Sequence, residues 1–172
     1  VVGGWYESNK VRFRAGTPEK IGGWQRISAN TFQGICRSIW NWVTLASQNL
    51  LGLGTNLKFY IENGGQYYDI TPVRRAVVLN GPFTTNATTT VTVTDASHGC
   101  VTGDFVTFSN ASTVDGLNLN NEYQITVTGL NTYTITASSA ASGSTVGGGG
   151  AYVNAIYQLN VGPEYQIPVV GW

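Results

Sequence analysis

Apolar and polar residues alternate along four stretches in the second half of the chain. In each stretch β-branched or aromatic residues occupy every second position, and most of the residues between them are threonines. A period of two is typical of a strand that buries one face. The pattern predicts strands over residues 90–94, 104–108, 123–127 and 133–136, with hairpin turns at Asp115-Gly116 and at Leu130-Asn131.

Four further apolar runs follow one another in the first half, over residues 39–45, 49–54, 57–61 and 67–72. They predict a four-stranded up-and-down sheet, the unit from which a β-propeller blade is built. One such sheet cannot bury both of its faces, so we expect it to need neighbours from a longer chain or from other subunits. Residues 31–38 could form one helical turn, but no stretch carries a sustained apolar stripe with helical spacing.

The composition separates the same two parts. Charged residues make up 10% of the chain, against a usual share of about 25%, and sixteen threonines fall between residues 84 and 145. The Ser- and Gly-rich residues 138–150 predict a mobile loop or linker. We therefore expect an all-β chain with a scaffold over residues 1–82, an inserted Thr- and Gly-rich antiparallel module over residues 83–150, and a return strand within residues 151–172.

A net charge of zero hides a division between the two parts. Residues 1–76 hold all nine cations and four acids, a net charge of +5, whereas the rest of the chain holds five acids and no cation, a net charge of −5. Such asymmetry indicates two modules with different surroundings. Arg12 and Arg14 lie two residues apart on an expected strand and so project from one face, where they could contact phosphates. Because +5 is modest, we favour ion pairs between subunits.

The residue types do not predict a catalytic centre. His98 is the only histidine, which rules out a multi-histidine metal site, and we expect it to belong to a structural turn. There is no Gly-x-Ser-x-Gly motif and no phosphate-binding glycine loop, and the acids stand singly beside turns. We therefore expect no enzyme, no metal and no cofactor. Cys36 and Cys100 are expected to be reduced and buried.

Aromatic residues are frequent, at 12% of the chain. They could form a carbohydrate platform, but packing in the core and at subunit contacts explains them more simply. No stretch approaches the roughly 18 apolar residues that span a bilayer, so membrane insertion is not expected.

Five ordered motifs stand in the first part of the chain. They are Gly-Gly-Trp-Tyr at residues 3–6, Val-Arg-Phe-Arg at 11–14, a Pro-Glu-Lys-Ile-Gly-Gly-Trp turn at 18–24, Gly-Thr-Asn-x-Lys at 54–58 and Tyr-Asp-Ile-Thr-Pro at 68–72. Together they resemble the N-terminal part of a family of tailed-bacteriophage virion structural proteins, of the tail nozzle or tail-tube hub type. The resemblance covers roughly residues 3–76.

This resemblance implies a β-propeller-like scaffold in a homo-oligomeric ring, expected to be a hexamer, in the tail of the virion. The ring would adjoin the portal, the adaptor and other tail proteins, and viral DNA would pass through its lumen during ejection. It implies no catalysis, and it implies that the chain continues beyond Trp172. Five residues are then expected near subunit boundaries or the lumen, with ion pairs as the first use of their charges and DNA contact as the second: Arg12, Arg14, Lys20, Trp24 and Arg26.

A second set of motifs lies within residues 90–137, where His-Gly, Gly-Asp-Phe-Val-x-Phe and Leu-Asn follow in order. They are similar to the first catalytic cysteine half-domain of ubiquitin-activating enzymes, a small antiparallel β-barrel insert. No adenylation site accompanies them, so the resemblance implies the fold of an inserted barrel and not the activity. The alternative function is a tail or capsid surface decoration or adhesin protein that engages a host-surface receptor through the Thr-rich module.

Overall fold

The computed structural model describes residues 9–23, 26 and 28–159. All helix or strand structure in these residues is β-strand, which confirms the all-β prediction. The part of the chain that the structure describes contains no helix that could cross a membrane. The strands are β1 (Val11–Arg14), β2 (Thr17–Lys20), β3 (Cys36–Val43), β4 (Asn49–Thr55), β5 (Phe59–Asn63), β6 (Gln66–Asp69), β7 (Val73–Leu79), β8 (Phe83–Thr84), β9 (Thr90–Thr94), β10 (Phe105–Ser109), β11 (Glu122–Gln124), β12 (Thr126–Gly129), β13 (Thr132–Thr136) and β14 (Val153–Gln158).

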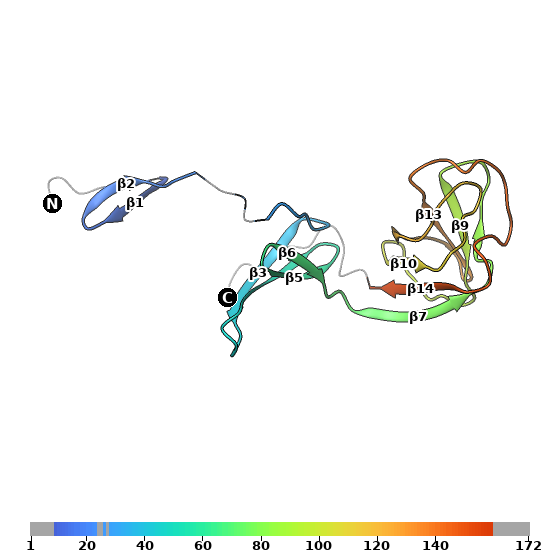
Figure 1. Ribbon diagram of the computed structural model, residues 1–172, viewed down its shortest axis with the longest axis horizontal. Helices are drawn as coiled ribbons and strands as arrows, with labels where there is room; N and C mark the ends of the chain where they lie inside the picture. Colours follow the sequence, from blue (N-terminus) through green and yellow to red (C-terminus); the bar gives the residue numbers. More distant parts are fainter. Residues whose placement is uncertain (1–8, 24–25, 27, 160–172) are drawn as a thin grey trace.

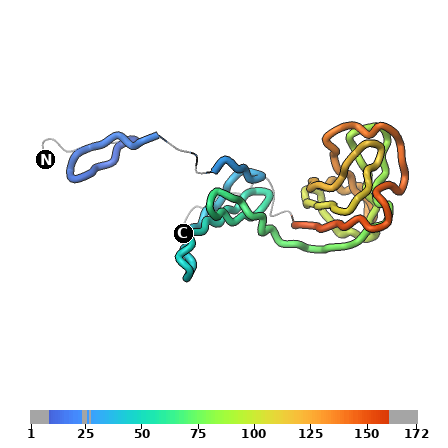
Figure 2. Tube along the Cα trace, in the orientation of Figure 1, coloured from blue at the N-terminus to red at the C-terminus, as the bar shows by residue number. Residues whose placement is uncertain are grey.

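The molecule is elongated and has three parts in a row (Figure 1). The N-terminal hairpin (β1 and β2) lies at one end, the scaffold sheet (β3–β6) lies in the middle, and the β module (β7–β14) lies at the other end. The trace in Figure 2 shows that the chain leaves the scaffold sheet through β7 and comes back toward it along β14.

The N-terminal hairpin turns at Ala15 and Gly16, which have φ angles of +48° and +81°. Positive φ at both central positions is typical of a two-residue type I′ hairpin turn, whose backbone matches the right-handed twist of the strands. Arg14 therefore pairs with Thr17, and Pro18 lies inside β2 opposite Phe13. The predicted turn beginning at Pro18 is wrong in place, because the chain has already reversed two residues earlier.

The scaffold sheet is an antiparallel meander in the order β3-β4-β5-β6, as the four apolar runs predict. Part of one of its faces, over β5 and β6, is covered by the segment that precedes β3. The ring of Phe32 lies edge-on against Tyr67 with centroids 5.1 Å apart, and it also contacts Tyr60. The backbone N–H of Gln33 donates to the Tyr60 hydroxyl at 3.2 Å. This covered face holds Leu53 and Tyr60, the most buried apolar side chains of the sheet.

The β module consists of two four-stranded antiparallel sheets around one core, in the orders β11-β10-β14-β7 and β12-β13-β9-β8. The predicted alternation is present in β9, where Val91 and Val93 are buried and Thr90 and Thr94 are exposed. Aromatic and aliphatic residues of both sheets fill the core, among them Phe83, Val106, Phe108, Tyr133, Ile135, Val153 and Tyr157. Strand pairing in the described residues leaves the two sheets separate, so it closes no barrel, and the scaffold sheet is one blade and not a propeller.

The pattern predicts one strand over residues 123–127, but the structure has two strands in different sheets. β11 pairs with β10, whereas β12 pairs with β13. Ile125 between them is buried, and Tyr123 and Val127 pack against the same core. Since all three side chains face one core, the hydrophobic alternation continues through the change of sheet and does not reveal it.

The Gly- and Ser-rich residues 138–150 are not a free linker, contrary to the sequence-based prediction. Their backbone runs beside residues 81–87 and bonds to it repeatedly. Gly81, Phe83 and Thr85 donate their N–H groups to the carbonyls of Gly150, Gly148 and Thr145 at 2.8, 3.1 and 2.9 Å. The small side chains allow the two backbones to approach closely. A Gly- and Ser-rich composition, which is often found in flexible linkers, is therefore found here in an ordered and packed segment.

β7 and β14 pair with each other inside the β module, and β14 also pairs with β10. β14 lies within residues 151–172, where a return strand to the scaffold is expected, but its partners β7 and β10 both belong to the β module. Its last residue contacts the scaffold side, where the Gln158 amide bonds to Lys58 and to Asp69. Both cysteines are free. Cys100 is buried as predicted, whereas Cys36 is half-buried because it opens β3 at the edge of the scaffold sheet.

Candidate functional site

The second face of the scaffold sheet is open and aromatic, and we call it the aromatic face. The strand register places Trp40, Gly52, Ile61 and Tyr68 side by side in one row across the four strands. Trp40 is 73% exposed and Tyr68 is 56% exposed. Side chains of alternate strand residues share a face. From Ser38 onward this face carries no charge, and its strand residues are Ser38, Trp40, Trp42, Leu50, Gly52, Gly54, Phe59, Ile61, Asn63, Gln66 and Tyr68.

Two glycines form the floor of the aromatic face. A Cβ at Gly52 would lie 3.2 Å from the Trp42 ring, and a Cβ at Gly54 would lie 3.6 Å from the Phe59 ring. The rings therefore lie over the glycine positions and beside them, and a shallow hollow of about 210 Å³ opens between Trp40, Phe59 and neighbouring residues. Flat aromatic surface with a trough and no charge suits contact with another apolar surface.

The cations predicted near subunit boundaries fall in two places. Arg12, Arg14 and Lys20 lie exposed on the N-terminal hairpin, where Arg12 pairs with Glu19 on the opposite strand at 3.1 Å. Arg26 is exposed and lies instead beside a hollow that Ser28, Phe32 and Tyr67 help to line. Trp24 lies outside the described residues.

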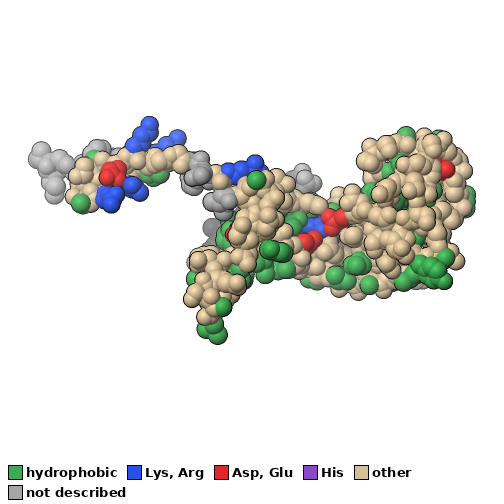
Figure 3. Space-filling model, in the orientation of Figure 1, with side chains coloured by type: hydrophobic (Ala, Val, Ile, Leu, Met, Phe, Trp, Pro, Cys, Tyr) green, Lys and Arg blue, Asp and Glu red, His purple; other side chains and the backbone are tan. Residues whose placement is uncertain are grey.

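A buried cluster of charged side chains joins the scaffold sheet to the β module, and sequence reasoning did not single it out. We call it the Lys58 junction. Lys58 is 1% exposed, and its ammonium donates to Asp69 at 2.6 Å, to Gln158 at 2.8 Å and to Glu122. The same ammonium lies 4.7 Å from the centroid of the Phe105 ring. In Figure 3 this cluster appears as a blue group between red ones, where the two parts meet.

Opposite charges decide the protonation state at the Lys58 junction. Burial alone would lower the pKa of Lys58, but hydrogen bonds to Asp69 and Glu122 outweigh it and raise the pKa. Burial would likewise raise the pKa of Asp69, but bonds from Lys58 and Thr71 lower it. The other oxygen of Glu122 accepts from the Gln33 amide at 2.7 Å. The junction is thus charged, and side chains from both parts satisfy it.

Two more cations from residues 1–76 bind acids from residues 77–172. Arg75 donates to both oxygens of Asp95 at 2.7 and 3.1 Å, and Tyr157 donates to the same carboxylate at 2.6 Å. Arg74 lies 3.5 Å from Asp104. Lys58, Arg74 and Arg75, three of the nine cations in residues 1–76, therefore each meet an acid of residues 77–172 within the same chain.

His98 is held as part of a turn. It is buried, its Nδ1 accepts from the Cys100 N–H at 3.0 Å, and its Nε2 lies 3.0 Å from the Gly129 carbonyl oxygen. Its ring lies edge-on against Tyr133. Burial raises the pKa of the Cys100 thiol. Within the described ranges no group of three or more His, Cys, Asp or Glu side chains is arranged to hold a metal ion.

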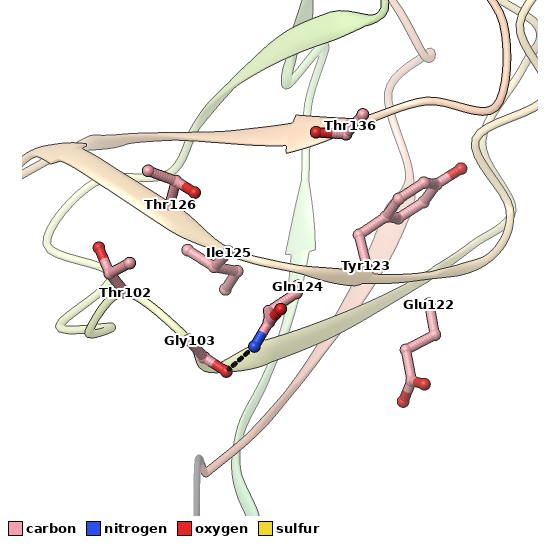
Figure 4. A pocket seen from close by; sticks show the side chains of 8 residues that line it. All are labelled: Thr102, Gly103, Glu122, Tyr123, Gln124, Ile125, Thr126 and Thr136. Atoms are coloured by element: carbon pink, nitrogen blue, oxygen red, sulfur yellow. Dashed lines mark hydrogen bonds between the residues drawn. The ribbon is translucent and has the colours of Figure 1, made fainter. Parts of the chain in front are cut away.

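A polar hollow of about 460 Å³ opens in the β module where β11 gives way to β12. Figure 4 shows it lined by Thr102, Gly103, Glu122, Tyr123, Gln124, Ile125, Thr126 and Thr136. The figure also shows the Glu122 carboxylate directed away from the threonines, consistent with its bonds to Lys58 and Gln33.

Comparisons with known proteins agree with one of the two resemblances. Residues 86–155 match the family model of the ubiquitin-activating enzyme E1 FCCH domain, the first catalytic cysteine half-domain, which confirms the resemblance seen in residues 90–137. The match covers less than half of the chain. No curated protein sequence matches the chain.

Among solved structures the chain is similar to the phage phi92 endosialidase, at 18% sequence identity and with a TM-score of 0.43. The similarity covers 84% of this chain and 21% of that one, so the chain spans about a fifth of the length of the phage protein.

Proposed function

We propose that this chain is a structural component of a tailed-bacteriophage tail, of the nozzle or hub ring type that forms part of the DNA-ejection conduit. The ordered motifs of residues 3–76 support the phage assignment, and the aromatic face carries the structural role. The proposal includes no catalytic step. The ring, its portal and adaptor neighbours and the passage of DNA belong to the same proposal.

The aromatic face supports assembly because it exposes large aromatic side chains, whereas the other face of the sheet is partly covered and buries Leu53 and Tyr60. Trp40, Tyr68 and Phe59 are 73%, 56% and 42% exposed. Contiguous exposed apolar surface on soluble proteins marks interaction sites, and aromatic residues carry much of the binding energy at such sites. A neighbouring blade from another subunit would cover these rings and leave no buried charge unpaired.

The N-terminal hairpin supports the same role. Among the described residues its two strands pair with each other alone. An isolated two-stranded hairpin is marginally stable in water and gains stability by packing on another element. Arg14 and Lys20 are exposed on it. They are available to a neighbouring subunit, or to the phosphates of DNA in the conduit.

The function is tested on purified phage particles that encode this chain. Mass spectrometry should find the polypeptide in the tail, and a particle map should show several copies of the scaffold sheet around the conduit axis. A particle that lacks the polypeptide would exclude the tail role. A map with a single copy away from the axis would exclude the ring.

The assembly surface is tested by a charge on the aromatic face. Trp40→Glu should shift the chain toward monomer in sedimentation experiments, because a carboxylate at the centre of an apolar contact loses about 2–4 kcal/mol per contact. Leu130→Glu is the matched control, since Leu130 is 74% exposed but lies in the turn between β12 and β13. Equal association of both variants and the unchanged chain would rule out the aromatic face as the contact.

A second candidate function is that of a surface decoration or adhesin protein that meets a host receptor through the β module. One observation favours it, namely the open polar hollow at the end of the β module sheets. This role is compatible with a tail position, since adsorption proteins are themselves carried on tails.

A further inference from the structure

The polar hollow is built on a rigid crossing of the backbone. At Ile125 the chain passes from one sheet of the β module to the other, and the Ile125 side chain is 1% exposed. Its N–H donates to the Asp104 carbonyl at 2.8 Å, and its own carbonyl accepts from Gly103 at 2.9 Å. These two hydrogen bonds hold the backbone at Ile125. Gln124 ends β11 in one sheet and Thr126 begins β12 in the other, so the hollow opens between the two sheets at this point.

The side chains around this opening keep hydrogen-bonding capacity. The Thr102 hydroxyl oxygen accepts from the Val127 N–H at 3.0 Å, so its own proton is left to donate. The Gln124 amide nitrogen donates to Gly103 at 3.2 Å and retains a second N–H and an acceptor oxygen. Figure 4 shows the Thr126 and Thr136 hydroxyls at the same opening.

The hollow offers a ligand no unpaired charged side chain. Glu122 is the one charged residue in its lining, and Lys58 and Gln33 already bind that carboxylate. Burial raises the pKa of Tyr123, so this residue stays a neutral phenol. A site without cations does not favour a phosphate or another anion, and a site whose only carboxylate is paired does not favour a free cation.

The remaining chemistry is that of a small polyhydroxylated molecule. Hydroxyl and amide groups can donate to and accept from sugar hydroxyls, while the half-buried Tyr123 ring offers an apolar surface to sugar C–H groups. A volume of about 460 Å³ lies within the usual range for small-ligand sites. We propose that this hollow binds a neutral saccharide unit, with Gln124 and Thr126 as the main hydrogen-bonding residues. The proposal deepens the adhesin role and does not depend on the ring.

The experiment screens the full chain against an array of neutral and acidic glycans and then titrates the best neutral glycan by ¹⁵N NMR. Neutral glycans should bind, and shifts should centre on residues 102–103 and 123–126. Gln124→Ala and Thr126→Val should each weaken binding about tenfold, the effect of losing one or two hydrogen bonds. Thr113→Val is the matched control, because Thr113 is exposed in the β module and does not line the hollow. Thermal melting confirms that all variants are folded.

Binding that is confined to acidic glycans, no neutral glycan bound, or unchanged affinity in both variants would each overturn the saccharide site. Failure of the tail role is seen separately, as absence of the polypeptide from particles. A chain absent from particles that still binds the glycan would retain the site and lose the tail function.

Discussion

Gly149 shows at the scale of one residue why the Gly-rich segment is ordered. Its φ is +101°, and a Cβ placed on it would lie 2.5 Å from Cδ2 of the buried Phe83 ring. Only glycine combines this backbone conformation with that approach. The sequence shows four glycines at 147–150, but it cannot show that Phe83, more than sixty positions away, lies against one of them.

Gly149→Ala should destabilise the chain by about 2–4 kcal/mol, since it combines an unfavourable positive φ with an overpacked core. Thermal and chemical unfolding measure the change. Gly22→Ala is the control, because nothing lies within 4 Å of a Cβ at Gly22 and its φ is not positive. A Gly149 variant as stable as the control would mean that the segment does not pack on Phe83.

At the scale of elements, the hydrophobic periodicity predicted most strands. It failed where two consecutive strands differ only in the strand with which each one pairs. The apolar runs located β3–β6 well because turn residues separate one run from the next, and alternation located β9, which buries Val91 and Val93 and exposes Thr90 and Thr94. The same period could not separate β11 from β12, which share one core. It also could not distinguish a linker from residues 138–150, whose order comes from backbone bonds to residues 81–87.

Hydrogen exchange tests the ordering of that Gly-rich element. The amides of Phe83, Thr85 and Gly148 should exchange slowly, because each donates to a backbone carbonyl across the two segments. The amides of Gly22 and Gly23, which are exposed outside the strands, should exchange near the rate of an unfolded chain. Equally rapid exchange at both sets would restore the linker interpretation.

At the scale of the whole molecule, the Lys58 junction sets how the β module sits on the scaffold sheet. One ammonium binds Asp69 of β6 together with Glu122 and Gln158 of the β module. Removing one member of a buried charge cluster leaves the others unpaired. The junction therefore stabilises the relative placement of two parts that each have their own strands and packing.

Lys58→Met should cost about 1–3 kcal/mol, less than a fully buried pair would, because the Asp69 and Glu122 side chains remain 27% and 23% exposed. The main effect should be a broader distribution of distances between two spin labels, one on a cysteine introduced at Gln66 and one on a cysteine introduced at Thr113. The chain also carries Cys36→Ser, so that the free cysteine at this position takes up no label. Lys20→Met is the control on an exposed lysine. An unchanged distribution in the Lys58 variant would show that other contacts hold the parts together.

The junction should also respond to pH at both extremes. The pKa of Asp69 is lowered from 3.8, so its contribution is complete above pH 3.8 and is lost as the pH falls through the folded value. The pKa of Lys58 is raised from 10.5, so its contribution is complete below pH 10.5 and is lost as the pH rises through the folded value. Burial raises the pKa of Tyr60 nearby, which keeps that group neutral through neutral pH. The same spin-label distances, followed against pH, should stay narrow between these limits.

The amino-acid sequence by itself determined the all-β class, the four-stranded scaffold sheet, the FCCH-like module and the uneven distribution of charge. These depend on local alternation, on turn residues and on ordered motifs, all of which act over a few positions. Only the tertiary structure decided that Lys58, Arg74 and Arg75 meet Glu122, Asp104 and Asp95, that the Gly-rich segment is packed, and that one face of the scaffold sheet stays open. Those features join residues tens of positions apart, and chain spacing does not encode which distant side chains will share one buried site.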